Sequence, residues 1–150
     1  MTEMSARPGH LARRFQQIAV AIFHREVAAA GSDLTPVQFA ALETVAAQPG
    51  LDQATLAGLI AYDRATITGV VDRLVNRGLV TRETSARDRR AKLLAVTPAG
   101  EELLARIEPS VAAAQEIMLR GLTPEESADF MRLLRKAVDG ANDLSRAPLR

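Results

Sequence analysis

The sequence has no cysteine and no tryptophan, and only one tyrosine and four phenylalanines among its 150 residues. The lack of cysteine excludes disulfide bonds, thiolate metal sites and cysteine-based redox sensing. No apolar run approaches the roughly 18 residues that a membrane-spanning helix requires. The N-terminus also lacks the charged-then-apolar pattern of a secretion signal. We therefore expect a cytoplasmic protein of the bacterial type, with no cofactor and no metal.

The composition is typical of a helical protein packed by aliphatic side chains. Hydrophobic residues make up 47% of the chain, which excludes wholesale disorder, and aromatic residues make up only 3%. A chain of this length forms one compact unit that is large enough to bury a core of its own.

Positive charge is concentrated in one segment, although the formal net charge of the chain is only +1. Residues 73–92 contain seven basic and two acidic side chains, a net charge of +5, so the other 130 residues together carry −4. Such a segment is typical of a nucleic-acid contact surface, and a solvated charged face is the alternative. Because the basic residues gather on one predicted turn and one helix end, we favour DNA contact.

The first helix is predicted over residues 9–30, and Gly31 ends it. Its large apolar residues recur at a spacing of 4, 3 and 4, which places them on one face of the helix. They are Leu11, Phe15, Ile18 and Ile22. We interpret this face as a dimer contact; packing within its own monomer is the alternative.

Capping and turn signals divide the rest of the chain. Thr35-Pro36-Val37-Gln38 is a typical helix start, and Asp52 and Asp63 are N-cap residues for two further helices. The predicted elements are helices over 36–47, 53–61 and 64–77, strands over 79–84 and 91–97 joined by 85–90, and helices over 98–120 and 124–141. Pro109 is expected to kink its helix or break a backbone bond. The tail from Asn142 onward is expected to be frayed.

These elements predict a mainly α fold with a small β-hairpin wing. Residues 35–97 form a winged helix-turn-helix domain for DNA binding. Residues 1–34 and 98–150 form a helical dimerisation region, since their apolar faces cannot be buried by one chain alone.

Several stretches resemble the MarR family of winged-helix regulators. They are DQATLAGLIAYDRATITGVVDRLVNRGLV, the ARDRR of the hairpin with Asp88 and Arg90, and LAVTPAGEELL at the start of the long helix. The resemblance is specific over residues 52–104 and rests on helix order elsewhere. The segments LTPVQFAAL and DQATLAGLIAYDRATI are most similar in sequence to family members that control breakdown of nicotinate, hydroxycinnamate and related aromatic acids. The resemblance implies a homodimeric repressor on a pseudo-palindromic operator, released by a small aromatic carboxylate or phenol.

The second helix of a helix-turn-helix enters the major groove, where its N-terminal turns meet base edges. Here those turns carry Arg64, Thr66 and Thr68. Arginine pairs bidentately with guanine, and threonine forms hydrogen bonds or packs on a thymine methyl group. For Arg64, an ion pair with Asp63 or Asp72 is the alternative.

Other polar residues of this domain are expected to contact phosphates or the minor groove. The second helix of the helix-turn-helix, here called the recognition helix, carries Arg73, Asn76 and Arg77 beyond its first turns. The preceding helix begins with Gln53 and Thr55. By resemblance, Arg90 reaches the minor groove and Asp88 braces it, with a simple turn role for Asp88 as the alternative. Arg87 and Arg89 are expected to supply nonspecific charge.

The resemblance also implies an effector site between the helical dimerisation region and the winged domain. Arg13 and Arg14 can pair with a carboxylate, Phe15, Phe39 and Tyr62 can contact a ring, and His10 and His24 can donate hydrogen bonds. For Phe15 and Phe39 the alternative is plain core packing, and for His24 a surface position. Arg14 is the first choice for the ligand.

Two other classes of function remain. An enzyme is disfavoured, because His24-Arg25-Glu26 matches half of a zinc deaminase signature whose cysteines are absent. No phosphate-binding glycine loop, G-x-S-x-G elbow or H-E-x-x-H is present either. A winged helix that shapes DNA or contacts a protein without an effector is the second alternative.

Overall fold

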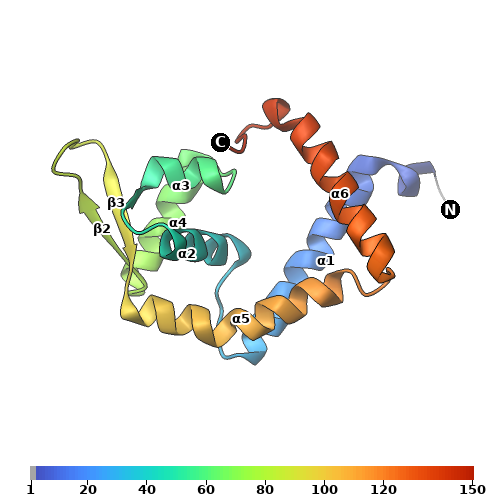
Figure 1. Cartoon of the computed structure of the whole chain (residues 1–150), viewed down its shortest axis with the longest axis horizontal. Coiled ribbons are helices and arrows are strands. Elements are labelled where there is room, and N and C mark those ends of the chain that lie inside the picture. The colour runs from blue at the N-terminus through green and yellow to red at the C-terminus, as the bar shows by residue number, and fades with distance from the viewer. Residues whose placement is uncertain (1–2) are drawn as a thin grey trace.

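The computed structural model describes residues 3–150 as a compact head joined to a stalk of long helices (Figure 1). We use "head" for residues 35–97 and "stalk" for the helices α1, α5 and α6. The head contains α2 (Pro36–Ala47), β1 (Leu51–Asp52), α3 (Gln53–Leu59), α4 (Arg64–Asn76), β2 (Val80–Thr84) and β3 (Lys92–Val96). The stalk helices are α1 (Pro8–Ala29), α5 (Pro98–Met118) and α6 (Pro124–Gly140). Short 3-10 turns, η1 (Glu3–Ala6) and η2 (Asn142–Leu144), flank the stalk helices.

The predicted helix start at Thr35 is confirmed, and a similar one is present at Thr123. Thr35 and Gln38 form a reciprocal capping box at the start of α2, and Thr123 and Glu126 form another at the start of α6. Gly78 has a φ of +70° directly after α4, which only glycine adopts without strain. The mainly α fold class with a hairpin is therefore correct.

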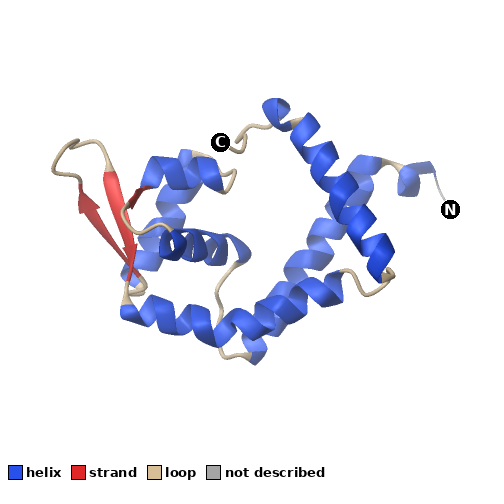
Figure 2. Cartoon of the chain, viewed as in Figure 1, coloured by secondary structure: helices blue, strands red, loops and turns tan. Residues whose placement is uncertain are grey.

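The sheet has three strands, one more than the sequence predicts (Figure 2). The order is β1-β3-β2, and both pairings are antiparallel. Val80 lies opposite Val96 and Thr84 opposite Lys92, while the two residues of β1 pair with Leu93 and Leu94. β1 has only two residues, too few for the alternating pattern by which a strand is predicted from sequence. Only its pairing with β3 in the folded chain identifies it as a strand. It holds the hairpin against the start of α3.

One hydrophobic core connects the head to the adjoining parts of the stalk. Val27 of α1, Leu42 of α2, Ile67 of α4, Leu94 of β3 and Ile107 of α5 are all buried within it. The head therefore packs on the C-terminal half of α1 and the N-terminal half of α5. None of the residues of α6 is buried, and α6 leaves a row of apolar side chains exposed. Among the residues described, no helix is long and apolar enough to cross a membrane.

Two expectations about the C-terminal third need correction or refinement. The helix α5 continues through Pro109, which therefore removes one backbone donor without ending the helix. The expectation of a frayed tail after Asn142 is wrong. The tail folds back onto the head, where the backbone N–H of Arg150 donates to the carbonyl oxygen of Gly58 at 3.0 Å.

Candidate nucleic-acid interface

Two aspartates fix the starts of the two helices that form the helix-turn-helix. The Asp52 carboxylate accepts from the backbone N–H of Thr55 at 2.9 Å, and the Asp63 carboxylate accepts from that of Thr66 at 2.8 Å. Each carboxylate also accepts from the hydroxyl of the same threonine. The hydroxyl and N–H of Thr55 lower the pKa of Asp52, and the N–H and hydroxyl of Thr66 lower the pKa of Asp63. The turn between the helices is tight, since Ala61 has a φ of +55°.

Arg64, at the first turn of α4, is exposed, and its guanidinium forms no ion pair or hydrogen bond within the described part of the chain. The alternative pairing with Asp63 or Asp72 is therefore not what the structure contains, because Asp63 caps α4 and Asp72 pairs with Arg82. A free guanidinium at this position retains all five donors for a ligand.

Thr66 and Thr68 are exposed on the same helix, and both hydroxyls are held in place. The Thr66 hydroxyl donates to Asp63 at 2.7 Å, and the Thr68 hydroxyl donates to the backbone carbonyl of Arg64 at 2.9 Å. The Thr68 oxygen also accepts from the side-chain amide of Gln53 at 3.2 Å. These bonds orient the threonine methyl groups and leave acceptor lone pairs toward solvent.

Arg82 of β2 is a residue that the sequence analysis did not single out. Its guanidinium donates to Asp72 of α4 at 2.6 Å and to the amide oxygen of Gln53 at 3.4 Å. Since Gln53 in turn donates to Thr68, Arg82 connects the wing to both helices of the helix-turn-helix. In the sequence it is one arginine in a basic run, and only the pairing of strands brings it to Asp72.

The far end of α4 carries three polar residues with different surroundings. Arg73 and Asn76 are exposed, and no side-chain partner is present among the described residues. Arg77 forms an ion pair with Asp33, its Nη2 lying 2.9 Å from the carboxylate oxygen. The Arg77 side chain thus has a partner outside α4, at the segment between α1 and α2.

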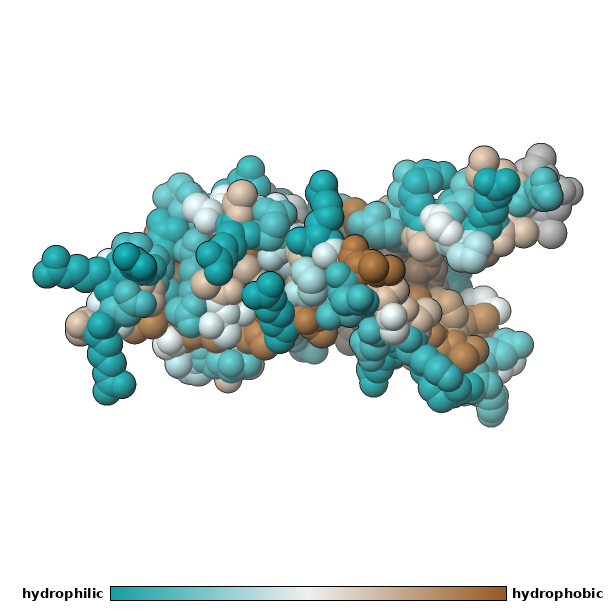
Figure 3. Space-filling view, turned by 90° about the horizontal axis from the view of Figure 1, so that it is seen from above, coloured by the Kyte–Doolittle hydropathy of each residue, from teal (hydrophilic) through white to brown (hydrophobic). Residues whose placement is uncertain are grey.

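The tip of the wing is shaped by two small polar side chains. The Ser85 hydroxyl accepts from the backbone N–H groups of Arg87 and Asp88, and the Asp88 carboxylate accepts from the backbone N–H of Arg90 at 2.9 Å. Asp88 therefore braces the backbone at Arg90 and forms no ion pair with its guanidinium. Arg87, Arg89 and Arg90 are exposed. In Figure 3 long hydrophilic side chains project from this end of the molecule.

Comparison with known proteins identifies the family. Residues 32–91 match the model of the MarR family. HosA of Escherichia coli, a transcriptional regulator, is 36% identical over 107 residues, which cover 71% of this chain and 79% of HosA. The chain belongs to the MarR family. HosA is a regulator and not an enzyme, which agrees with the expected absence of catalysis.

Solved MarR-family structures have the same fold over nearly the whole chain. The transcriptional regulator PcaV of Streptomyces coelicolor, in complex with its natural ligand, has a TM-score of 0.85 and 35% identity, covering 94% of this chain and 98% of its own. BpsR of Bordetella bronchiseptica, whose DNA binding is regulated by 6-hydroxynicotinic acid, has a TM-score of 0.85 and 33% identity, covering 93% and 98%. This chain is thus a MarR-family winged-helix regulator.

The candidate effector residues come from separate parts of this MarR-family chain. Phe39 is 9% exposed and packs against Phe23, with ring centroids 5.8 Å apart, so it is a core residue. Tyr62 lies in the turn between α3 and α4. His10, Arg13 and Arg14 belong to the N-terminal half of α1, in the stalk (Figure 1). Arg13 donates to Gln17 at 3.0 Å, and His24 is exposed.

The candidate dimer residues are divided between internal packing and exposure. Phe15 packs edge-on against Phe130 of α6 with a centroid separation of 5.4 Å, and Ile22 is half-buried. Leu11 and Ile18 are each 48% exposed on the same face of α1. On α6, further large apolar side chains are exposed: Met131, Leu133, Leu134 and Val138. The stalk therefore presents an apolar surface of considerable extent.

Proposed function

We propose that this chain is a homodimeric, sequence-specific DNA-binding repressor whose affinity for its operator is lowered by a small aromatic acid. The observation that supports this most directly is Arg64, a free guanidinium at the exposed N-terminal turn of α4. A guanidinium in this place suits bidentate pairing with guanine in the major groove. A repressor of this kind acts on chromosomal DNA in the cytoplasm.

Base recognition falls to the first turns of α4. Arg64 donates to a guanine, and the oriented Thr66 and Thr68 present methyl groups and hydroxyl oxygens to neighbouring bases. Gln53, held between Arg82 and Thr68, lies beside these residues and can contact a base or a phosphate. Thr55, Arg73, Asn76 and Arg77 are proposed phosphate contacts, and Arg77 would have to exchange Asp33 for a phosphate.

The wing is proposed to contact the minor groove. The Ser85 and Asp88 bonds give the tip a fixed backbone conformation, from which the free Arg90 can enter a narrow A·T-rich groove. Arg87 and Arg89 contribute charge that does not depend on sequence.

The exposed apolar surface of α1 and α6 supports a homodimer. Two-fold symmetry places the two recognition helices about 34 Å apart, so that the operator is a pseudo-palindrome with half-sites about 10 bp apart. Dimerisation through Leu11, Phe15, Ile18 and Ile22 would also cover Leu11 and Ile18, which are each 48% exposed in one protomer.

An aromatic acid is the proposed effector, by analogy with the 6-hydroxynicotinic acid that regulates BpsR. Arg14 and Arg13, with His10, remain the proposed carboxylate contacts, and Tyr62 a proposed ring contact. These residues come from α1 in the stalk and from the α3–α4 turn of the head, so a site that uses them all would bridge the two parts, and the second protomer of the proposed dimer can contribute to it.

The DNA proposal is tested by selecting duplexes from a random pool and measuring their affinity by fluorescence anisotropy. We expect a pseudo-palindrome, and an affinity that falls about 10³–10⁵-fold between 50 and 200 mM salt if 6–10 phosphates are contacted. Arg64→Ala should cost about 1–3 kcal/mol for the selected duplex and relax the preference at one base pair. Equal affinity for all duplexes would instead support an architectural DNA-binding protein.

The effector proposal is tested by thermal shift against a panel of aromatic acids that includes 6-hydroxynicotinic acid. We expect at least one acid to raise the melting temperature and to lower operator affinity in the anisotropy assay. Arg14→Ala should abolish both effects, whereas Arg25→Ala, on the same helix, should leave them intact. No response to any acid would refute the proposal.

A further inference from the structure

The segment after α6, residues 142–150, forms an ordered strap across the head. Asn142 closes it, since its side-chain amide donates to the carbonyl of Leu149 at 3.1 Å and its side-chain oxygen accepts from the Leu149 N–H at 2.9 Å. The Ser145 hydroxyl accepts from the backbone N–H of Ala147 at 3.1 Å. Ala147 and Pro148 are half-buried. The strap therefore has a defined conformation held by its own side chains.

The seat of the strap is α3, the first helix of the helix-turn-helix. The N–H of Arg150 donates to the carbonyl oxygen of Gly58, and a Cβ atom at Gly58 would lie 3.2 Å from the Arg150 Cβ. Glycine inside a helix costs about 1 kcal/mol relative to alanine. Close approach of the strap is a physical reason for glycine at this position.

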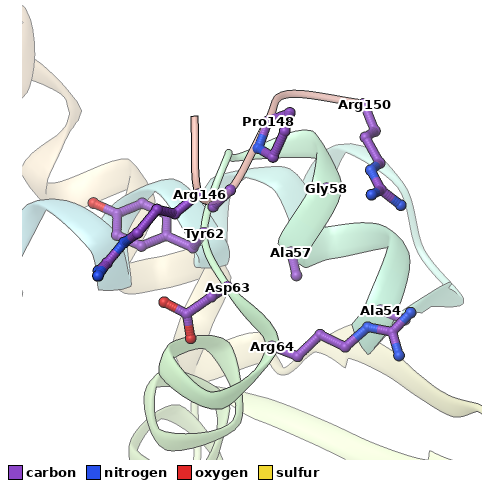
Figure 4. Close-up of a pocket in the computed structure, with 10 residues that line it drawn as sticks. Ala54, Ala57, Gly58, Tyr62, Asp63, Arg64, Arg146, Pro148 and Arg150 are labelled. Carbon is purple, nitrogen blue, oxygen red and sulfur yellow. The ribbon is translucent and has the colours of Figure 1, made fainter. Parts of the chain in front are cut away.

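The strap places two arginines beside the recognition helix. A pocket of about 320 Å3 lies between the strap and the α3–α4 turn, and Arg64, Arg146 and Arg150 line it together with Asp63. In Figure 4, Arg64 and Arg150 extend along the same side of α3 toward Ala54, while Arg146 lies over Tyr62 and Asp63. The Asp63 carboxylate is occupied by Thr66, and neither Arg146 nor Arg150 has an ion-pair partner within residues 3–150.

We propose that the strap is an additional DNA-contacting arm, in which Arg146 and Arg150 bind backbone phosphates near the base pair that Arg64 contacts. Guanidinium groups are strong phosphate ligands. Arg146 extends away from the side of α3 on which Arg64 and Arg150 lie, so the three guanidinium groups do not surround a single point (Figure 4). This arrangement suits a polyanionic backbone better than a free anion. The proposal rests on the DNA-binding function proposed above.

The test is the salt dependence of binding to the selected duplex and to a random-sequence duplex of the same length. Each phosphate contact contributes about 0.9 to the slope of log K against log salt. Arg146→Ala/Arg150→Ala removes four arginines from a dimer, so the slope should become shallower by about 3.6 on both duplexes, with affinity lowered by about tenfold or more. Arg135→Ala/Lys136→Ala, which removes the same charge from exposed positions of α6, should leave the slope as in the unmodified protein.

Gly58→Ala tests the seat without removing charge. The added methyl group crowds Arg150, so the slope should become shallower while the melting temperature stays the same or rises. Two outcomes would overturn the proposal. The first is a salt slope in Arg146→Ala/Arg150→Ala that equals that of the unmodified protein. The second is the same unchanged slope together with inorganic phosphate stabilising the unmodified protein but not this variant. The second outcome would assign the pocket to a free anion. If the unmodified protein binds no duplex, the DNA-binding function itself fails, which is a distinguishable result.

Discussion

Single side chains at the head divide into those that hold the backbone and those left free for a ligand. Asp52, Asp63, Ser85 and Asp88 accept backbone N–H donors at helix starts and at the wing tip. Arg64 has no partner within the described chain and projects from a backbone that these acceptors fix. The candidate interface is therefore preorganised in its backbone, while the Arg64 and Arg90 side chains stay exposed to water.

The Asp63 cap makes part of the stability dependent on pH. Because its folded-state pKa is lowered from 3.8 by the N–H and hydroxyl of Thr66, its contribution is present above that value and is lost as the pH falls through the lower folded pKa. We expect Asp63→Asn, which caps a helix equally well without titrating, to lose less stability on acidification. Urea unfolding midpoints of both proteins between about pH 6 and pH 2 measure the difference. Parallel curves for the two proteins would contradict this assignment.

The junction of the hairpin with α5 joins elements that the sequence separates. The Thr97 hydroxyl accepts from the N–H of Gly100 at 3.1 Å and donates to the carbonyl oxygen of Gly78 at 2.6 Å, so one side chain connects the ends of α4, β3 and α5. Gly100 is buried against this point. A Cβ atom there would lie within 2.3 Å of the Leu79 carbonyl oxygen and 2.6 Å of a Val96 methyl group.

Gly100→Ala should therefore destabilise the protein, because the obstacle is the backbone carbonyl oxygen of Leu79, which also accepts from the N–H of Thr97. We expect a loss of about 1–3 kcal/mol, typical of overpacking. The matched control is Gly69→Ala in α4, where a Cβ atom meets nothing within 4 Å and stability should rise by about 0.8–1 kcal/mol. Urea unfolding at one protein concentration checks both; equal effects of the two substitutions would disprove the crowding.

At the scale of the whole molecule, α6 is the helix whose apolar side chains are not covered within the described chain. It buries none of its residues, although several of them are apolar: Val138 is 58% exposed and Leu133 is 53% exposed. The first helix adds Leu11 and Ile18. An amphipathic helix with its apolar face in water is stable only if another surface covers that face.

Leu11→Glu/Ile18→Glu should separate the proposed dimer into protomers, since both glutamates would be buried without partners at the proposed contact. We expect the dissociation constant to rise about a hundredfold or more. Gln16→Glu/Gln17→Glu, on exposed positions of the same helix, adds the same charge and should leave the dimer intact. Sedimentation velocity over a range of concentrations distinguishes the two. A variant that sediments as the unmodified protein does would rule out this contact.

What the sequence could predict was local in origin. The caps Thr35, Asp52 and Asp63 act on backbone within three residues, so their signals lie within a short window and the helices followed correctly. β1, the Arg82–Asp72 ion pair and the strap depend on residues brought together only by folding. Asp88 lies between these cases: its position in the wing was predictable, but whether it braces a guanidinium or a backbone N–H was not.

The Thr97 junction has a consequence for how regulators of this shape can diversify. Because the Thr97 hydroxyl joins the ends of α4, β3 and α5, we expect the surface proposed to meet bases to move together with the start of α5. Sequence changes in α1 and α6 can alter the separation and tilt of the two heads in the proposed dimer. They need not alter the residues proposed to meet the bases. In the proposed dimer, half-site spacing and half-site sequence would then be set by different parts of the chain, so one can change while recognition of the other is kept.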